Sequence, residues 1–373
     1  MSRCPKLLFV VTEDWYFVSH RLPLALAAQK AGFDVVVATR EGEHGERIRA
    51  EGIRLIPCHL SRRRGNPLQE IAMLARLYRR ERPDIVHHVA LKPVLYGALA
   101  AKIAAVPHVV NAVAGLGWLF TSNTLAVKAL RPAFCRLLVW LLGASSSCTI
   151  VQNPDDFGLL TQKGVPEDRL RLIRGAGVDT EVFAPPSQLP SEPVTVVFAA
   201  RMLLDKGVRE FVEAAHVLTD AGVKARFVLV GDPDPGNPAS VPDTSLRAWH
   251  GQHGIEWWGR REDMPAVLQL GHIACLPSYR EGLPKVLLEA AACGLPLVTT
   301  DAPGCRDVVH DGDNGFLVPI RNAQALALAL ARLIEDAALR ATMGRRAREI
   351  VLAEFSQERI IKETLAVYLE LTP

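Results

Sequence analysis

The chain has 373 residues, of which 49% are hydrophobic and 22% are charged, and its formal net charge is +3. A chain this apolar with so little net charge is neither disordered nor fibrous, and its length predicts two domains. Its seven cysteines show no CxxC pair and no metal-ligand spacing, so we expect buried thiols in a reducing cytoplasm.

The first half alternates short apolar strands with helices, which is typical of a parallel sheet built from βαβ units. One helix is predicted at 20–32 and another at 66–83, where Asn66 can cap the helix and Pro67 takes its first position. Strands are predicted at 7–11, 34–39, 84–89, 108–113 and 148–153. The first strand is too short for a signal-peptide core, and no apolar run reaches the ~20 residues of a membrane-spanning helix.

The second half repeats this pattern, so the predicted fold class is α/β with two Rossmann-like domains. Its strands are predicted at 194–200, 225–231, 272–278 and 295–300, and its helices near 207–221, 244–253, 262–270 and 285–293. The proline-rich segment 183–193 suits neither a helix nor a sheet interior, and we interpret it as the linker between domains 1–186 and 187–354. An amphipathic helix is predicted at 357–371, within a terminal segment 355–373.

Charge is divided unevenly between the two predicted domains. Residues 1–186 carry a net charge of +8 and residues 187–373 a net charge of −5. The first domain is therefore expected to have an anionic partner. Because open parallel sheets bind ligands at the carboxyl ends of their strands, we expect the function in a cleft across which the two domains face each other.

The stretch SYREGLPKVLLEAAACG joins a predicted strand of the second domain to a predicted helix. Pro284 can open this helix, and the free N–H groups and positive dipole end of a helix favour a phosphate. Glu281 precedes the helix, and Glu289 lies roughly 8 Å along its axis at ~1.5 Å per residue. Carboxylates accept hydrogen bonds from sugar hydroxyls, so this spacing suits a nucleoside diphosphate sugar.

A diphosphate also needs cations, which Arg201 and Lys206 supply just past the first strand of the second domain. Taken singly, a glutamate pair eight residues apart, or an Arg and a Lys on a loop, is usually solvated surface. Their joint occurrence at the carboxyl ends of strands in one domain favours a binding site.

These motifs resemble the retaining, GT-B-fold glycosyltransferases of family 4. The resemblance is carried by the E-x7-E spacing from Glu281 to Glu289, by the R-x4-K-G setting of Arg201 and Lys206, and by the stretch 301–319. It implies that Glu281 contacts the donor sugar, that Glu289 contacts the ribose hydroxyls, and that Arg201 and Lys206 hold the diphosphate. It also implies that the terminal segment 355–373 packs back on the first domain.

The same resemblance implies further contacts to the donor. The amides near Gly282 and Leu283 would add hydrogen-bond donors. The stretch 255–265 resembles the family's base-binding loop and places Gly259 and Arg260 near the nucleobase. The alternative for this stretch is a plain strand, loop and helix with two packed tryptophans.

In the first domain the resemblance points to acceptor-binding residues. His20 lies on a predicted helix as in the family's first βα unit, although the glycine pair expected before it is replaced by EDWYFVS. His88 and Lys92 lie at the end of a predicted strand, where a histidine is equally well a core group. Many relatives have a histidine where this chain has Ala114, and Asn111 is only a weak substitute for it as a base. In the front-face attack proposed for the family, the departing diphosphate takes the acceptor proton, so no side-chain base is needed.

Basic residues lie beside apolar faces at 61–67, 76–83 and 125–143, an arrangement that can rest on an anionic leaflet and admit a lipid diphosphate. The alternative is an ordinary core helix with snorkelling ends. Nucleic acid is not expected as the partner, because the basic groups are not interleaved with stacking aromatics. The loops WLFTS and FVSHRLPLA resemble those of transferases in bacterial surface-glycan and lipid-linked oligosaccharide assembly.

The sequence therefore predicts a retaining glycosyltransferase, peripheral on the cytoplasmic face of the cell membrane. It would move an N-acetylhexosamine from a UDP-sugar donor to a polyprenyl-diphosphate-linked saccharide. No metal or other cofactor is expected, because Arg201, Lys206 and the helix dipole would take the place of Mg²⁺. Three alternatives stay open: a transferase with a soluble acceptor, a sugar-nucleotide epimerase of the same fold, and a non-catalytic sugar-nucleotide-binding module. A NAD-dependent dehydrogenase is disfavoured by the missing G-x-G-x-x-G.

Overall fold

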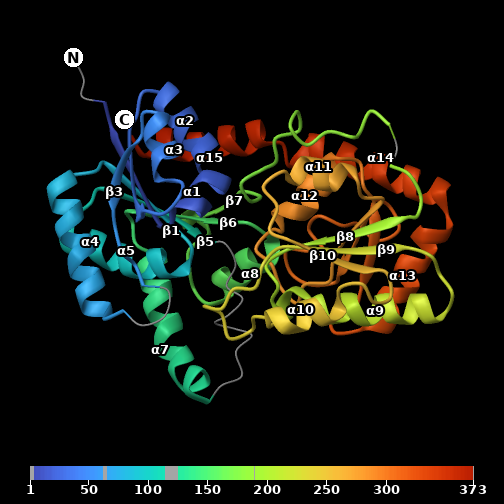
Figure 1. Cartoon of the computed structure of the whole chain (residues 1–373). Helices are drawn as coiled ribbons and strands as arrows, with labels where there is room; N and C mark the ends of the chain where they lie inside the picture. The colour runs from blue at the N-terminus through green and yellow to red at the C-terminus, as the bar shows by residue number, and fades with distance from the viewer. Residues whose placement is uncertain (1–3, 62–64, 114–124, 189, 373) are drawn as a thin grey trace. The chain divides into compact units, whose positions relative to one another are not determined.

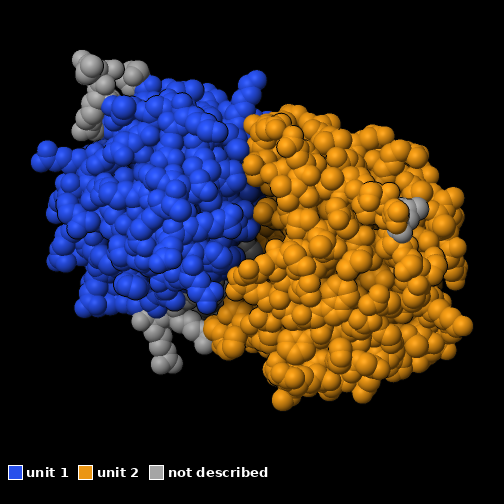
Figure 2. All heavy atoms as spheres, turned by 45° about the horizontal axis from the view of Figure 1, so that its top comes forward, with its two compact units in different colours: residues 1–176, 360–373 blue, residues 177–359 orange. Residues whose placement is uncertain are grey.

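The computed structural model describes residues 4–61, 65–113, 125–188 and 190–372, with the backbone alone for 125–131. The chain divides into two compact units, each with its own hydrophobic core (Figure 2). Unit 1 comprises residues 1–176 and 360–373, and unit 2 comprises residues 177–359.

Within the described residues, unit 1 is built on a seven-stranded parallel sheet in the order β3-β2-β1-β4-β5-β6-β7 (Figure 1). Its central strands are buried on both faces, as parallel strands covered by helices are. The strands are β1 (Lys6–Glu13), β2 (Asp34–Arg40), β3 (Arg54–Pro57), β4 (Ile85–Val89), β5 (His108–Val113), β6 (Ser147–Val151) and β7 (Leu170–Leu172). The helices are α1 (Asp14–His20), α2 (Leu22–Lys30), α3 (Gly45–Ala50), α4 (Pro67–Glu81), α5 (Leu91–Ala104), α7 (Leu125–Leu142), α8 (Pro154–Gln162) and the short η1 (Glu167–Arg169).

The five strands predicted for the first half are all confirmed, and so is the helix capped by Asn66, whose side chain accepts hydrogen bonds from the N–H groups of Leu68 and Gln69. The helix predicted at 20–32 is α2, and the shorter helix α1 precedes it. Strands β3 and β7 were not predicted, because four and three residues are too few to show a period. Across the described helices, none is both long and apolar enough to cross a bilayer.

Unit 2 is built, within the described residues, on a six-stranded parallel sheet in the order β10-β9-β8-β11-β12-β13. The strands are β8 (Thr195–Ala199), β9 (Arg226–Val230), β10 (Ile255–Gly259), β11 (Ile273–Leu276), β12 (Leu297–Thr300) and β13 (Gly315–Val318). The helices are η2 (Leu204–Lys206), α9 (Val208–Asp220), α10 (Asp243–Trp249), α11 (Met264–Gln269), α12 (Lys285–Ala292), α13 (Ala323–Glu335) and α14 (Ala337–Glu354). The predicted α/β class with two parallel-sheet domains is therefore confirmed.

Helix α15 (Gln357–Leu371) ends the chain, and its residues from Ile360 onward belong to unit 1. Tyr368 is fully buried in the core of that unit, where its ring packs edge-on against Phe9 and Phe33. Its hydroxyl lies 2.5 Å from Nδ1 of His87 on β4. Apolar packing and a buried hydrogen bond therefore join the carboxyl-terminal helix to the first sheet.

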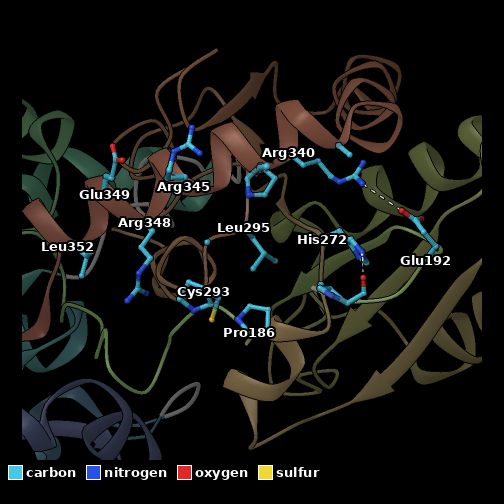
Figure 3. Close-up of a pocket in the computed structure, with 17 residues that line it drawn as sticks. Pro186, Glu192, His272, Cys293, Leu295, Arg340, Arg345, Arg348, Glu349 and Leu352 are labelled. Carbon is cyan, nitrogen blue, oxygen red and sulfur yellow. Dashed lines mark hydrogen bonds and ion pairs between the residues drawn. The ribbon is translucent and has the colours of Figure 1, made fainter. Parts of the chain in front are cut away.

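The proline-rich segment 183–193 forms neither helix nor strand, as its composition indicates, but it is fastened to unit 2. Arg348 donates a hydrogen bond to the carbonyl oxygen of Phe183. Nε2 of His272 lies 3.2 Å from the carbonyl oxygen of Pro190 (Figure 3). The chain therefore passes between the units at 176–177 and again at 359–360, whereas the sequence had suggested 186–187 and 354–355.

This fastened segment also lines a pocket of about 600 Å³ in unit 2 (Figure 3). Gly271 and Pro296, which line it as well, lead into β11 and β12, so the pocket lies at the amino-terminal ends of these strands. Ligands of open parallel sheets bind at the opposite, carboxyl-terminal ends. Lys206 and Glu281 lie at that other edge, in the loops that follow β8 and β11.

Candidate active site

Strands β8 and β11 pair directly in the second sheet, although β9 follows β8 in the chain. The strand order reverses here, and the loops that leave the carboxyl ends of two such strands diverge and make room for a ligand. The loop after β8 carries Lys206, and the loop after β11 carries Glu281. Nζ of Lys206 lies 2.5 Å from Oε1 of Glu281, and each side chain is less than one-fifth exposed.

Two glycines allow these loops to approach so closely. Gly207 has a φ angle of +77°, and a Cβ atom there would lie 2.1 Å from the carbonyl oxygen of Pro277. Gly304, in the loop after β12, has a φ angle of +81°, and its Cβ atom would lie 2.5 Å from the carbonyl oxygen of Glu281. Gly207 therefore allows the loop that carries Lys206 to approach the strand end that leads to Glu281, and Gly304 allows the loop after β12 to pack against the Glu281 loop.

Helix α12 begins directly after Pro284, and Gly282 and Leu283 connect the Glu281 loop to it. The first N–H groups of any helix lack a carbonyl partner earlier in that helix, and here the N–H of Leu287 donates to the carbonyl oxygen of Pro284 at 3.0 Å. Together with the positive end of the helix dipole, the first N–H groups make a helix start attractive to an anion. A helix therefore begins beside the loop that carries Glu281, at the position where the sequence predicts a phosphate.

Glu289 lies on the second turn of α12 and is buried. Its Oε1 atom lies 3.2 Å from Nζ of Lys285, one turn earlier on the same helix. Burial raises the pKa of Glu289, and the ammonium group of Lys285 opposes that rise. Lys285 therefore favours the charged form of this carboxylate, and donated hydrogen bonds from sugar hydroxyls would favour it too.

Arg201 lies just past β8, but its guanidinium is paired with Asp234, at 2.7 Å between Nη1 and Oδ2. Asp234 belongs to the loop after β9. In the same loop, Asp232 accepts a hydrogen bond from the backbone N–H of Arg260 at 3.0 Å. Gly259, with a φ angle of +66°, ends β10 just before that amide. The loop after β9 thus links Arg201 to Gly259 and Arg260, apart from the Lys206–Glu281 pair.

Two of the residues predicted to bind the acceptor lie in the core of unit 1. His88 and Asn111 are register partners on β4 and β5, both fully buried, with 2.9 Å between Nδ1 and Oδ1. Nε2 of His88 lies 3.0 Å from the hydroxyl of Tyr78, so both ring nitrogens have partners. Burial lowers the pKa of His88 to about 4. This geometry is that of a neutral core histidine and leaves neither residue an atom to offer a ligand.

The other two predicted acceptor residues are less buried. Lys92 lies 2.5 Å from Oε2 of Glu70, which links α5 to α4. His20 ends α1, and its ring stacks on that of Tyr16 with centroids 4.1 Å apart. Ala114 lies outside the described residues, so the missing histidine at that position stays a sequence observation.

Three charged partners in this region were missed by sequence reasoning. Lys285 could have been found, because it stands four residues before Glu289 and such pairs meet on one helix face. Asp234 lies in an irregular loop that gives no periodic signal, and its contact with Arg201 depends on the pairing of β8 with β9. Glu210 contacts Tyr279 across 69 positions of sequence, which no local pattern reports.

Comparison with known proteins assigns a family to these two units. Residues 6–152 match the family model described as "Glycosyl transferase 4-like", and residues 193–336 match the model described as "Glycosyl transferases group 1". Together the two matches cover most of the chain, one in each unit. The chain is a glycosyltransferase of this two-domain family. The predicted membership of family 4 and the predicted enzyme class are thereby confirmed.

Individual relatives agree with this assignment. An N,N'-diacetylbacillosaminyl-diphospho-undecaprenol alpha-1,3-N-acetylgalactosaminyltransferase of Campylobacter jejuni is 28% identical over 93% of this chain and 94% of its own length. A UDP-Gal:alpha-D-GlcNAc-diphosphoundecaprenol alpha-1,3-galactosyltransferase of Escherichia coli is 24% identical over 82% of this chain and 80% of its own. The crystal structure of Anabaena HepE in complex with UDP and glucose superposes with a TM-score of 0.79 at 20% identity, covering 98% of this glycosyltransferase and 99% of that chain. The structural likeness identifies the fold as GT-B.

Proposed function

We propose that this glycosyltransferase transfers an N-acetylhexosamine, with retention, from a UDP-sugar to a saccharide carried on a polyprenyl diphosphate. The observation that carries the proposal is the Lys206–Glu281 pair at the strand-order reversal of unit 2, next to the start of α12. The Campylobacter relative, which matches along nearly the whole chain, is named for transfer of N-acetylgalactosamine to a diphospho-undecaprenol-linked sugar.

Different residues of unit 2 bind different parts of the donor. The ammonium of Lys206 and the first turn of α12 attract the diphosphate, and Arg201 joins them once it leaves Asp234. Glu281 accepts hydrogen bonds from hydroxyls of the donor sugar, and Glu289 accepts them from the ribose. Gly259 and Arg260 contact the nucleobase.

The transfer needs charge stabilisation more than a side-chain base. The bond between the sugar C1 and the diphosphate oxygen breaks, and a bond from C1 to the acceptor oxygen forms on the same face. The acceptor proton passes to the departing diphosphate oxygen, so no protein atom has to take it. Lys206 and Arg201 stabilise the negative charge that develops on the leaving group, and the transfer is proposed to need no metal.

A transfer assay tests this proposal directly. UDP-N-acetylgalactosamine labelled in the sugar is incubated with the enzyme and a short saccharide on undecaprenyl diphosphate in vesicles, or with the same saccharide free in solution. We expect label to move to the lipid-linked acceptor only, and a melting temperature raised by UDP but not by GDP or ADP. Equal transfer to the free saccharide supports the soluble-acceptor alternative, and epimerised donor without transfer supports an epimerase; either contradicts the proposal.

The acceptor requires the enzyme to reach a membrane, and unit 1 offers a surface suited to one. Arg136 and Trp140 are exposed one turn apart on α7, and Trp140 is 57% exposed. Nζ of Lys102 on α5 lies 4.4 Å from the centre of the Trp140 ring, and the neighbouring Ile103 is 53% exposed. Exposed aromatic and cationic side chains of this kind bind the headgroup region of anionic bilayers. We propose that this face of unit 1 rests on the cytoplasmic leaflet.

The double variant Arg136→Gln/Trp140→Ala tests this membrane surface. Each basic residue near an anionic surface contributes ~1 kcal/mol, so the charge alone accounts for about a fivefold loss of binding to phosphatidylserine-containing vesicles, with the lost ring adding to it. The matched control is Arg345→Gln/Leu328→Ala, which removes an exposed arginine and an exposed leucine from unit 2. Vesicle sedimentation at low and high salt should separate the two variants. Identical sedimentation of the first variant and the native protein at both salt concentrations would refute the surface.

A further inference from the structure

We propose that Glu210 and Tyr279 form a clasp that holds the loops bearing Lys206 and Glu281 in register, which makes both of them positioning residues for the transfer. The inference rests on the proposed role of the Lys206–Glu281 pair. It adds two residues that do not touch the donor but fix the residues that do.

The two residues of the clasp are close in sequence to the two residues of the ion pair. Glu210 is in the first turn of α9, four residues after Lys206, and Tyr279 stands two residues before Glu281. The hydroxyl of Tyr279 donates to Oε1 of Glu210 at 2.5 Å. Burial, together with the hydrogen bond to Glu210, raises the pKa of Tyr279 to about 12, so the phenol keeps its proton and remains the donor.

Hydrogen bonds to a backbone carbonyl oxygen also join the two loops. The N–H of Tyr279 donates to the carbonyl oxygen of Asp205 at 2.9 Å, and the hydroxyl of Ser278 donates to the same oxygen at 3.1 Å. The two loops are therefore joined at three levels: Asp205 with the 278–279 backbone, the Lys206–Glu281 ion pair, and the Glu210–Tyr279 hydrogen bond. Only the ion pair involves groups that the donor is proposed to contact.

Burying Glu210 costs free energy that packing alone would not offset. It is only 7% exposed, and its second oxygen, Oε2, is buried without a hydrogen-bond partner among the described residues. A buried carboxylate with only one hydrogen bond costs the fold free energy, so packing alone does not explain its presence here. Tyr279 is held from the other face as well, because the guanidinium of Arg321 lies 4.7 Å from the centre of its ring. Arg321 itself adopts a φ angle of +58°, an uncommon conformation for a residue other than glycine.

This arrangement matters because the donor disturbs the ion pair. When a diphosphate binds Lys206, the ammonium shares its charge between the phosphate and Glu281, and the tie between the two loops weakens. The bond between Tyr279 and Glu210 does not involve the donor. It therefore keeps Glu281 in place against the donor sugar while Lys206 turns to the leaving group.

The test compares Tyr279→Phe, Glu210→Ala and Glu210→Gln with a matched control. Tyr279→Phe removes only the hydroxyl, whereas Glu210→Gln keeps an acceptor oxygen for it. Thr219→Val is the control, because it removes another hydroxyl hydrogen bond of α9, the one to the carbonyl oxygen of His253 at 3.0 Å. We expect kcat to fall about tenfold in Tyr279→Phe and in Glu210→Ala, with no further loss in their double variant, since both break one bond. The dissociation constant of UDP should change less than threefold, Glu210→Gln should restore most of kcat, and the control should match the native enzyme.

Two results of the kinetic and binding measurements would overturn the clasp. One is a native kcat in Tyr279→Phe, and the other is a parallel loss of kcat, UDP affinity and melting temperature in all three site variants, which is the signature of a packing role alone. Amide hydrogen exchange separates this outcome from a failure of the proposed reaction. In Tyr279→Phe, exchange should accelerate in segments 205–210 and 277–283 and stay native elsewhere, whatever the substrate. Unchanged exchange in these segments refutes the clasp even if the transfer reaction is confirmed.

Discussion

Replacing Glu281 by Gln, or Lys206 by Met, is expected to lower kcat at least ~10²-fold while the fold stays intact, which is the scale of losing one group that stabilises developing charge. In the proposed reaction, Lys206 faces the charge that grows on the leaving diphosphate. Glu281 would hold both Lys206, with which it is paired, and the donor sugar. The two groups lie 2.5 Å apart, and both side chains are largely shielded from solvent.

The control for these variants is another ion pair of unit 2. Arg346 and Glu349 lie 3.1 Å apart on α14. Glu349→Gln breaks that pair with the same change of side chain as Glu281→Gln. Its kcat should equal the native value, and circular dichroism should show the same unfolding transition for all variants within a few degrees. Native turnover in both Glu281→Gln and Lys206→Met would remove the site assignment.

Replacing Glu289 by Gln is expected to weaken UDP binding by about 10- to 100-fold, the scale of losing hydrogen bonds to a charged acceptor. The pH dependence of binding gives a second readout. Burial raises the pKa of Glu289, so on acidification it takes up a proton at a higher pH than an exposed glutamate does. UDP binding by the native enzyme should therefore weaken as pH falls through that raised value, whereas binding by Glu289→Gln should lack this step.

Lys285 provides a further check on the charge of Glu289. Because its ammonium lowers the pKa of Glu289, Lys285→Met should move the acid limb of UDP binding to higher pH. Glu335→Gln, an exposed glutamate on α13, is the matched control and should leave affinity and its pH profile unchanged. Calorimetric titration with UDP between pH 5 and 8 measures all four proteins. An acid limb that is the same in native enzyme and Glu289→Gln would show that this carboxylate does not contact the ribose.

Most of the sheet architecture could be predicted from the sequence, because buried parallel strands leave unbroken apolar runs such as 7–11 and 194–200. The loop residues Lys206 and Glu281 could be predicted to meet because the carboxyl ends of neighbouring parallel strands share one edge. Their contact at 2.5 Å, however, depends on β11 pairing with β8, which no local pattern reports.

Contacts made by side chains across the fold could not be predicted. Composition identified 183–193 as irregular, but its attachment to unit 2 depends on Arg348 and His272, which lie far along the chain. His88 is a second example. Its position near the end of a strand suggested a ligand contact, but in the fold both of its ring nitrogens have partners, the hydroxyl of Tyr78 and the side-chain oxygen of Asn111. The sequence shows which residues stand at the end of a strand. Tertiary packing determines which of these side chains can still contact a ligand.

The comparison of UDP with uridine, measured by calorimetry on the native enzyme and on Lys206→Met, probes most directly whether this part of unit 2 binds the diphosphate. We predict that the native enzyme prefers UDP by about a hundredfold, since uridine lacks the anion that Lys206 and the start of α12 attract, and that Lys206→Met loses most of this preference while binding uridine as before. An undiminished preference for UDP in Lys206→Met would contradict the account.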